Sequence, residues 1–238
     1  MILPLSRLTY SRRVSLAMLI FLIFEVLLMA FVDRPLSLHL RAVDADNRPL
    51  IDFFRAYTDF GKSGWYLWPS GIGLIICLAL GHWRQVAAPR RKKFRHNAKK
   101  FGFFFAAVAA SGIITDILKL LFGRARPVLL DREGFYGFDP FTFASVYKSF
   151  PSGHTTTAFA VAFALMALYP RGRVWWLIGA VSLGVSRVMV NAHYFSDLFA
   201  GALVAFLTVE GLRYLFVRRR WLFEKHGFFP IDRTARMR

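Results

Sequence analysis

The sequence predicts an all-α integral membrane protein built from six transmembrane helices. Hydrophobic residues make up 56% of its 238 residues, compared with about 45–50% in soluble domains. The chain also carries a formal net charge of +18, but its charged and apolar residues are segregated into alternating segments. A bilayer core of about 30 Å needs about 20 mostly apolar helical residues to cross it, and the apolar segments approach that length.

Six apolar runs justify the six spans in order along the chain. They cover residues 14–32, 65–82, 101–122, 154–169, 174–191 and 196–217. The fourth and fifth are short and interrupted by polar residues. The first is longer than the h-region of a signal peptide, about 7–15 residues, and no A-x-A site follows it, so we expect an uncleaved helix. Because no repeat or linker divides the chain, we expect a single domain over residues 1–238.

The connecting segments predict the orientation of the spans through their Lys and Arg content. With a cytoplasmic N-terminus, the four segments on that side contain twenty Lys and Arg residues, and the two opposite segments contain nine. The four are 1–13, 83–100, 170–173 and 218–238, and the two are 33–64 and 123–153. This excess places both termini in the cytoplasm. The outer segments also contain eight Asp and Glu residues, so we expect a nearly neutral outer face.

Composition excludes several other classes of protein. A disordered chain would contain far fewer apolar residues. The single cysteine, Cys77, rules out an intrachain disulfide. The basic run at 90–95 is explained by the topology and by contact with anionic lipid heads, so we expect no nucleic acid partner. We also expect no metal, because no carboxylate pair or cysteine group accompanies the histidines, and no obligate protein partner is evident.

The two outer segments have different characters. Residues 33–64 mix charged and apolar side chains, which predicts short helices at the membrane interface. Residues 123–153 contain seven Phe and Tyr residues among glycines and charges. Aromatic rings settle at the headgroup boundary of a membrane, so this segment suits the surroundings of an amphiphilic ligand.

Polar residues from three separate stretches reach the outer side in this topology. The first stretch is Lys119 near the outer end of the third span, followed by Arg124, Arg126 and Pro127. The second is Pro151–His154 at the start of the fourth span, and the third is Ser186, Arg187, Asn191, His193 and Asp197 around the turn between the fifth and sixth. Ionisable groups inside membrane spans are costly, so each of them needs a partner or a function. We therefore expect these stretches to form one site at the outer end of the bundle.

The chemistry of this site can be read from its residue types. Three cations, Lys119, Arg126 and Arg187, suit the oxygens of a phosphate. Ser152 and Gly153 begin a helix, where free backbone N–H groups favour an anion. Two histidines, His154 and His193, provide the number needed for one nucleophile and one acid/base. Asp197 follows His193 by one helical turn and is placed to accept its ring proton.

Three motifs together resemble those of a known family. Lys119-x6-Arg126-Pro127, Pro151-Ser152-Gly153-His154 and Ser186-Arg187-x5-His193-x3-Asp197 are similar to the signature motifs of the type 2 phosphatidic acid phosphatase superfamily. That superfamily includes membrane lipid phosphatases, soluble bacterial acid phosphatases and vanadium haloperoxidases. The resemblance covers about a third of the chain, and the six-span layout agrees with the membrane branch.

The resemblance implies a role for each residue. His193 would attack phosphorus and form a phosphohistidine, oriented by Asp197, while His154 would protonate the leaving group and then deprotonate water. The transition-state oxygens would be held by the remaining motif residues, namely Lys119, Arg126, Ser152, Gly153 and Arg187. The resemblance calls for no metal and no cofactor. Arg124 lies outside the motifs, and we expect its side chain to be solvated.

The expected function is metal-independent hydrolysis of a lipid phosphate or pyrophosphate at the periplasmic face of a bacterial inner membrane. Undecaprenyl diphosphate, phosphatidylglycerol phosphate, phosphatidic acid and lipid A 1-phosphate are all candidate substrates. A lipid phosphotransferase that uses the same intermediate is one alternative, and a non-catalytic anion or lipid transporter is a less favoured one. Glu25, Asp116 and Glu210 also lie within spans. Asp116 is expected to pair with a neighbouring cation, whereas Glu25 and Glu210 could snorkel, pair with an arginine or line a crevice.

Overall fold

The structure, a computed structural model, describes residues 10–223, and all regular structure in that range is helical. Six long helices are α1 (Tyr10–Phe31), α4 (Gly64–His82), α5 (Ala88–Phe122), α7 (Gly153–Leu168), α8 (Arg173–Met189) and α9 (Phe195–Arg218). The shorter elements are α2 (Asp33–Asp46), α3 (Arg48–Tyr57) and α6 (Pro127–Glu133), with 3₁₀ turns η2 (Thr58–Gly61), η3 (Ser145–Tyr147) and η4 (Pro170–Gly172). The predicted all-α class is confirmed over this range.

The long helices coincide with the six predicted spans, but they differ in length. Four stretches are long and apolar enough to cross a membrane, namely Val14–Phe31, Arg48–His82, Ala88–Phe122 and Phe195–Arg218. By contrast, α7 has 16 residues and α8 has 17, fewer than the about 20 that a perpendicular crossing needs. The apolar helices support a membrane protein, and the count of six spans stays a prediction.

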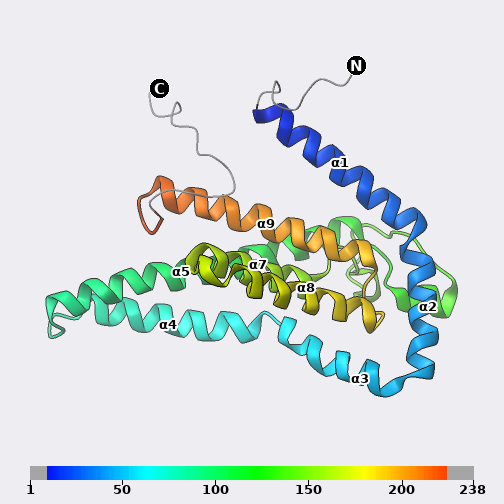
Figure 1. Cartoon of the computed structure of the whole chain (residues 1–238), viewed down its shortest axis with the longest axis horizontal. Helices are drawn as coiled ribbons and strands as arrows, with labels where there is room; N and C mark the ends of the chain where they lie inside the picture. The colour runs from blue at the N-terminus through cyan, green and yellow to red at the C-terminus, as the bar shows by residue number, and fades with distance from the viewer. Residues whose placement is uncertain (1–9, 224–238) are drawn as a thin grey trace.

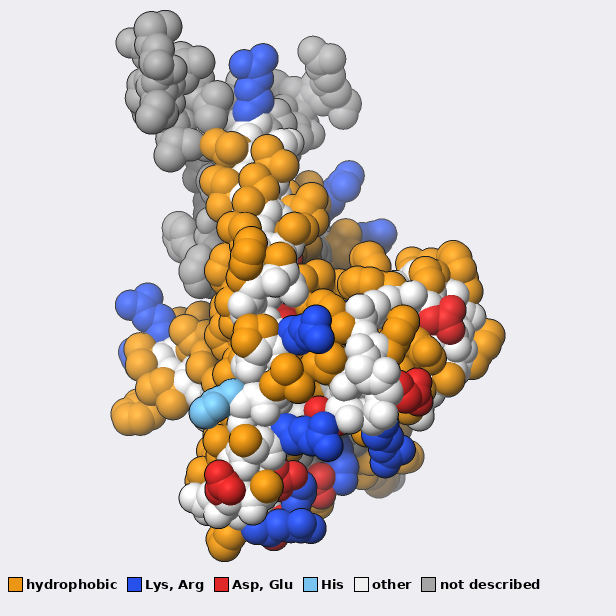
Figure 2. Space-filling model, turned by 90° about the vertical axis from the view of Figure 1, so that its right-hand side faces the viewer, with side chains coloured by type: hydrophobic (Ala, Val, Ile, Leu, Met, Phe, Trp, Pro, Cys, Tyr) orange, Lys and Arg blue, Asp and Glu red, His pale blue; other side chains and the backbone are white. Residues whose placement is uncertain are grey.

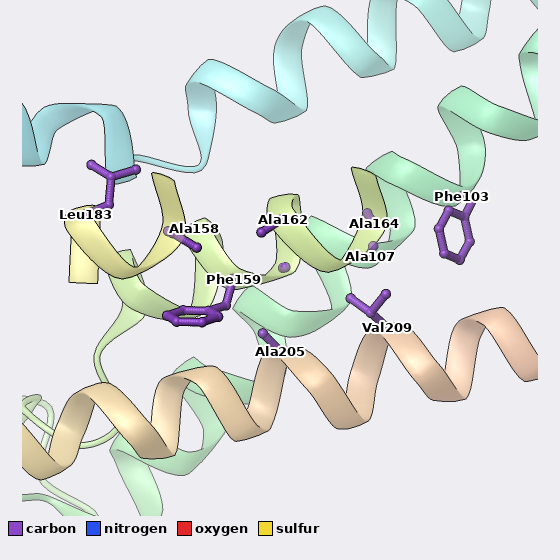
Figure 3. Close-up of a cluster of buried hydrophobic side chains, with 11 residues drawn as sticks. Phe103, Ala107, Ala158, Phe159, Ala162, Ala164, Leu183, Ala205 and Val209 are labelled. Carbon is purple, nitrogen blue, oxygen red and sulfur yellow. The ribbon is translucent and has the colours of Figure 1, made fainter. Parts of the chain in front are cut away.

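Small side chains allow the central helices to pack closely. Figure 3 shows Ala107 of α5, Ala162 of α7 and Ala205 of α9 in one buried cluster, each at most 2% exposed. Small residues let helix backbones approach one another, which is how helices associate within membranes. Phe103 and Phe159 fill the remaining space of the cluster. The tightly packed core therefore consists of α5, α7, α8 and α9.

Helices α4 and α5 form an antiparallel hairpin that extends beyond the other helices at one end (Figure 1). Gly73 lies against the ring of Phe101 and Gly81 against Arg95, so close that an added Cβ would fall 2.8 and 2.9 Å from those side chains. The 35 residues of α5 span about 52 Å, which exceeds the about 30 Å of a bilayer core. The tip of the hairpin, which carries the basic run at 90–95, therefore projects beyond the apolar part of the bundle.

At the opposite end, α2 runs across the ends of the bundle helices, and α3 leads from α2 back toward α4 (Figure 1). Asp33, Ser37 and Leu40 form the buried stripe of α2, at helical spacing, and Ile51 anchors α3 with no exposed surface. The short helices predicted within residues 33–64 are therefore present, and they cover the end of the bundle where the site residues meet.

Residues 1–9 and 224–238 lie outside the described part of the chain. The chain ends that are predicted to lie in the cytoplasm therefore fall outside the described residues.

Candidate active site

Four helix ends meet beneath α2 and bring the predicted site residues together (Figure 1). Their positions are Lys119 in the last turn of α5, Gly153 and His154 at the start of α7, Arg187 in the last turn of α8, His193 in the turn that follows and Asp197 in the first turn of α9. Charge effects connect them, since Arg126 and Arg187 both act on His193. The three stretches of the sequence therefore form one cluster, as predicted.

The tautomer of His193 follows from its hydrogen bond. Nδ1 lies 2.8 Å from the carbonyl oxygen of Ser149. A carbonyl oxygen can only accept, so Nδ1 carries the proton and donates it. The other ring nitrogen, Nε2, then holds the lone pair. A fixed neutral imidazole of this kind is the state that nucleophilic attack requires.

Burial keeps His193 neutral. Its side chain is 2% exposed, and this desolvation lowers the pKa of His193 from 6.5 to about 4. The negative charge of Asp197 opposes the shift, whereas the nearby cations Arg126 and Arg187 lower the pKa further. Near pH 7 the imidazole is therefore unprotonated at Nε2.

The carboxylate of Asp197 is fully buried and accepts from three donors. Its Oδ2 accepts from Ser149 Oγ at 2.6 Å and from the backbone N–H of Tyr194 at 2.9 Å, and its Oδ1 accepts from Arg124 at 2.6 Å. Nδ1 of His193 lies 3.4 Å from Oδ2, farther than the about 2.7–3.2 Å of an N–H hydrogen bond. Asp197 therefore orients His193 mainly through Ser149. The Ser149 carbonyl accepts the hydrogen bond from Nδ1 that we expected Asp197 to accept.

Arg124 is buried, so the expectation of a solvated side chain is wrong. Only 1% of the residue is exposed. Its Nη1 donates to Asp197 at 2.6 Å and to Ser196 Oγ at 2.7 Å, while its Nη2 donates to Asp33 at 2.7 Å and to Tyr136 Oη at 2.9 Å. Two carboxylates and two hydroxyls replace water around the guanidinium, which is what a buried charge requires.

Asp33 extends this network to the first two helices. It begins α2 directly after α1, and its Oδ1 accepts the backbone N–H of Ser196 at the start of α9. Burial alone would lower the pKa of Arg124, but the charges of Asp197 and Asp33 outweigh burial and raise it, so the guanidinium stays charged. The topology predicted from the sequence put all three charges near the outer ends of spans. Nothing in the sequence indicated that Arg124 would pair with Asp33, 91 positions away, and with Asp197, 73 positions away.

Arg126 and Arg187 present unsatisfied donors to the site. The Nε atom of each is buried, and no described residue accepts its hydrogen. Their terminal nitrogens make only a 3.5 Å contact to the Lys148 carbonyl and a 3.1 Å bond to Thr58 Oγ1. Buried N–H groups without a partner are costly. Phosphate oxygens would satisfy both guanidinium groups, so this arrangement suits an anion.

Gly153 lets Lys119 reach the start of α7. A Cβ at position 153 would lie 2.8 Å from Lys119 Nζ, closer than real Cβ contacts. The ammonium also lies 3.6 Å from the exposed carboxylate of Asp116, so the expected pairing of Asp116 with a cation is present. Lys119 thus stands beside the free N–H groups of the first turn of α7, where an anion is stabilised.

Ser152 is fully buried and its backbone is already engaged. Its N–H donates to the carbonyl of Asp197 at 3.1 Å, and its Oγ accepts from Thr155 Oγ1 at 2.9 Å. The first backbone bond of α7 is that from Thr156 to the carbonyl of Ser152, so the N–H groups of Gly153, His154 and Thr155 have no acceptor within the helix. The hydroxyl of Ser152 keeps its own proton to donate.

His154 lies against the 3₁₀ turn η2. A Cβ at Gly61 would fall 2.9 Å from both Cβ and Cδ2 of His154, so the glycine provides the room for this ring. Arg187, His193 and Lys119 are close enough to act on it by charge. The two predicted histidines therefore face the same group of cations.

A family comparison covers this same region. The model of the PAP2 superfamily matches residues 100–221, just over half of the chain and all eight predicted site residues. The chain belongs to the PAP2 superfamily. The family predicted from the three motifs is thereby confirmed, and Arg124 also falls within the matched region.

Named relatives of this PAP2 protein include two from Rhizobium. The "Lipid A 1-phosphatase" of Rhizobium johnstonii is 40% identical over 147 residues, which cover 60% of this chain and 59% of the relative. The protein of the same name from Rhizobium etli is 37% identical over 171 residues, 67% of this chain and 69% of the relative. "Lipid phosphate phosphatase 1" of Arabidopsis thaliana is 33% identical over 135 residues, 44% of this chain and 41% of the relative. These relatives support the predicted enzyme class, a phosphoric ester hydrolase acting on lipid.

The alignments are partial, since the chain spans about three fifths of the first Rhizobium relative and two fifths of the Arabidopsis one. No solved structure matches the chain.

The surface around the PAP2 site carries both signs of charge. Exposed ion pairs join Arg55 to Asp44 and Lys62 to Asp59 near the end of the bundle. Figure 2, which faces this end, shows Lys and Arg side chains next to Asp and Glu side chains. Within residues 10–223, no group of three or more His, Cys, Asp or Glu side chains is arranged to hold a metal ion.

The structure narrows the roles of the two glutamates left open by the sequence. Glu25 of α1 is 4% exposed, and neither of its carboxylate oxygens has a hydrogen-bond partner among the described residues. It therefore neither snorkels nor pairs with an arginine, and its charged neighbours are Asp197, Asp33 and Arg124. Glu210 forms an ion pair with Arg213 at 2.6 Å, one of the alternatives expected for it.

Proposed function

We propose that this PAP2 protein hydrolyses a lipid phosphate through a phosphohistidine at His193. The observation that carries the proposal is the hydrogen bond from Nδ1 of His193 to the Ser149 carbonyl, which leaves the lone pair on Nε2. The cations Arg126 and Arg187 act on this ring and have buried donors that await an anion. A neutral nucleophile beside cations with unpaired buried donors suits attack on phosphorus.

The proposed reaction proceeds in two steps. In the first, Nε2 of His193 forms a bond to phosphorus while the bond to the lipid oxygen breaks, and His154 donates a proton to that oxygen. In the second, His154 takes a proton from water as the water oxygen attacks phosphorus. The phosphorus–nitrogen bond then breaks, releasing inorganic phosphate and restoring neutral His193.

Electrostatic stabilisation accompanies both steps. The transferred phosphoryl group spreads negative charge over its equatorial oxygens, so fixed donors around it lower the barrier. We assign this role to the side chains of Lys119, Arg126, Arg187 and Ser152 and to the backbone N–H of Gly153. Arg124 has a different role, because its donors are already used by Asp33 and Asp197. It positions Asp197 rather than the substrate.

Among the candidate substrates we favour the 1-phosphate of lipid A. Both Rhizobium relatives, which match 60% and 67% of this chain, are named for that reaction. Phe141 and Phe143, in the segment that follows α6, have exposed rings that suit an amphiphilic substrate whose tails stay in the membrane. The backbone N–H of Phe141 donates to the carbonyl of Leu120, next to Lys119.

We further propose a bacterial inner membrane location, with the site facing the periplasm and both termini in the cytoplasm. Support comes from the excess of Lys and Arg in the opposite segments. In the fold, the basic residues before Lys100 lie at the far end of α5 from Lys119 (Figure 1). Substrate would then enter sideways from the outer leaflet.

A phosphate-release assay on the protein purified in detergent tests the proposal. The panel comprises lipid A, undecaprenyl diphosphate, phosphatidylglycerol phosphate and phosphatidic acid, with mass spectrometry of the lipid products. We expect release of the 1-phosphate of lipid A, unchanged activity with a chelator, and inhibition by vanadate. The matched control is His193→Asn, whose amide N–H can still reach the Ser149 carbonyl but which lacks Nε2.

Three outcomes would count against the proposal. Turnover by His193→Asn would remove the phosphohistidine, and loss of activity with chelator, restored by Mg²⁺, would remove the metal-free mechanism. Transfer of phosphate to a second lipid without release would identify a phosphotransferase.

A further inference from the structure

A second cavity lies between α4, α5 and α7, with a volume of about 420 Å³. Most of its lining is apolar, including Phe101 and Phe104 of α5 and Leu165 and Leu168 of α7. The volume falls within the about 300–1,000 Å³ of ligand sites in proteins. No His, Cys or carboxylate lines it, so it has no group that would repeat the chemistry of the first site.

The α5 side of the cavity is far from the candidate active site, whereas its α4 side, at Trp65 and Tyr66, lies nearer to it, since Tyr66 Oη donates to the carbonyl of Phe60 in η2. The α5 residues that line it, Asn97 to Phe104, precede Lys119 by 15 to 22 residues. At about 1.5 Å per residue this is about 22–33 Å along the helix. The hydrocarbon core of a bilayer is about 30 Å thick. With Lys119 at one boundary of the membrane, Lys100 therefore lies at the other.

The polar lining of the cavity is concentrated near that second boundary. Asn97 and Lys100 of α5 lie there with Tyr169 at the end of α7, and Lys100 Nζ is 5.7 Å from the centre of the Tyr169 ring. Such a contact holds the ammonium over the ring face. On α4, Ser70 Oγ donates to the carbonyl of Tyr66 and Tyr66 Oη donates to the carbonyl of Phe60, so both hydroxyls are satisfied within the protein.

The two chain segments beside this polar end are basic and contain no acidic residue. The nearby cations are Arg90, Arg91, Lys92, Lys93, Arg95 and Lys99 on α5 and Arg171 and Arg173 after Tyr169. No Asp or Glu occurs in residues 83–100 or 165–173. An apolar cavity with cations at one end is complementary to an amphiphile with an anionic head.

We propose that this cavity binds an anionic phospholipid of the leaflet opposite the active site. The phosphodiester lies beside Lys100 and Asn97, and one acyl chain lies along Phe101, Phe104 and Leu168. The lipid fills the space between α4 and α7, on the side of α5 that these two helices leave open. This inference is independent of the proposed function, because it uses none of the residues assigned to hydrolysis.

A lipid titration of the full chain in detergent tests this site. Native mass spectrometry measures the Kd for phosphatidylglycerol, with zwitterionic phosphatidylcholine as the comparison lipid. Lys100→Ala is matched by Lys99→Ala, which removes the same charge from an exposed residue that does not line the cavity. We expect Lys100→Ala to raise the Kd about tenfold or more, as for loss of a charged hydrogen bond. Lys99→Ala should raise it less than about threefold.

A second variant, Leu165→Trp, tests the apolar part by filling the cavity, and it should weaken binding of both lipids. Unfolding midpoints identify variants that are not folded. If Leu165→Trp is unfolded, the Kd values of the two lysine variants test the proposal without it. Equal Kd values for phosphatidylglycerol in the two lysine variants would overturn the proposal. Equal affinities of the unchanged protein for the two lipids would also overturn it.

Discussion

Arg124 determines how the charges of the candidate site are arranged, although it is not placed to touch the substrate. A buried guanidinium needs compensating charge, and two carboxylates supply it from opposite sides. One of them, Asp197, also holds the hydroxyl of Ser149, whose carbonyl fixes His193. The orientation of the nucleophile therefore depends on a residue that belongs to none of the three motifs. Sequence reasoning missed this because burial of Arg124 depends on a partner in a distant segment.

Substitution of Arg124 tests this positioning role. Arg124→Ala leaves Asp33 and Asp197 buried without a counter-charge, which costs on the order of 3–5 kcal/mol. We expect a lower unfolding midpoint in detergent and a kcat reduced about 10²-fold with little change in KM, because the nucleophile is displaced while the phosphate ligands stay. Arg124→Lys should restore little, since an ammonium cannot bridge two carboxylates as a planar fork does. The exposed Arg132→Ala is the control, and equal effects of the two alanine variants would contradict the prediction.

Substitutions of the two histidines are predicted to change the reaction rate in different ways. His193→Asn should abolish the covalent phosphoenzyme and reduce kcat on the order of 10⁴-fold or more. His154→Asn should slow the reaction about 10²–10⁴-fold for poor leaving groups and much less for good ones, because only poor leaving groups need the acid. Rates with a series of aryl phosphates of graded leaving-group pKa measure this difference. A uniform loss across the series in His154→Asn would contradict the assignment of the acid.

The lowered pKa of His193 predicts how stability depends on pH. Its pKa is about 4 in the fold and 6.5 when exposed, so the unfolded chain takes up the proton first as the pH falls. The neutral ring contributes fully to the free energy of unfolding above pH 6.5. This contribution is lost as the pH falls toward about 4, and the total loss is about 3 kcal/mol. We expect the unfolding midpoint of the unchanged protein to drop more over this range than that of His193→Asn. Parallel curves for the two proteins would show that His193 is not buried as a neutral ring.

At the scale of helices, hydropathy located the spans but not the full length of every helix. The third predicted span begins at residue 101, whereas α5 begins at Ala88. The added residues are mostly Arg, Lys and Ala, which are good helix formers, with Pro89 in the first turn, where proline is tolerated. An apolar criterion detects only the part of a helix that lies in lipid. The projecting α4–α5 hairpin could therefore not be read from hydropathy.

The junction of α5 and α7 depends on a glycine, which gives a prediction for these helices. Gly153→Ala would put a Cβ 2.8 Å from Lys119 Nζ. The lysine must then move from the start of α7, so we expect kcat/KM to fall about tenfold or more through loss of one charged phosphate contact. Gly179→Ala in α8 is the matched control, because nothing lies within 4 Å of its added Cβ. Equal activity of the two variants would show that Lys119 does not need this approach.

For the whole molecule, counting charges was enough to predict that three distant stretches would meet. The alternation of spans requires the end of α5, the start of α7 and the turn before α9 to lie on one side, and the fold agrees. What the count could not supply was the covering of this end by α2 and α3. Their contacts depend on tertiary pairs such as Ser37 with Asn191, at 2.8 Å, which have no local signal.

The orientation of the whole molecule can be tested with two cysteines placed at its opposite ends. In a Cys77→Ala background, Ser145→Cys marks the exposed loop beside the site, and Ala88→Cys marks the exposed tip of the α4–α5 hairpin. Spheroplasts are treated with a membrane-impermeant thiol reagent, and detergent-lysed cells serve as the control in which both positions react. The excess of Lys and Arg around the hairpin predicts that it lies in the cytoplasm. Before lysis we therefore expect the cysteine at position 145 to be labelled and the cysteine at position 88 to stay unlabelled. Labelling at 88 and not at 145 would invert the topology, put hydrolysis in the cytoplasm and exclude substrates of the outer leaflet.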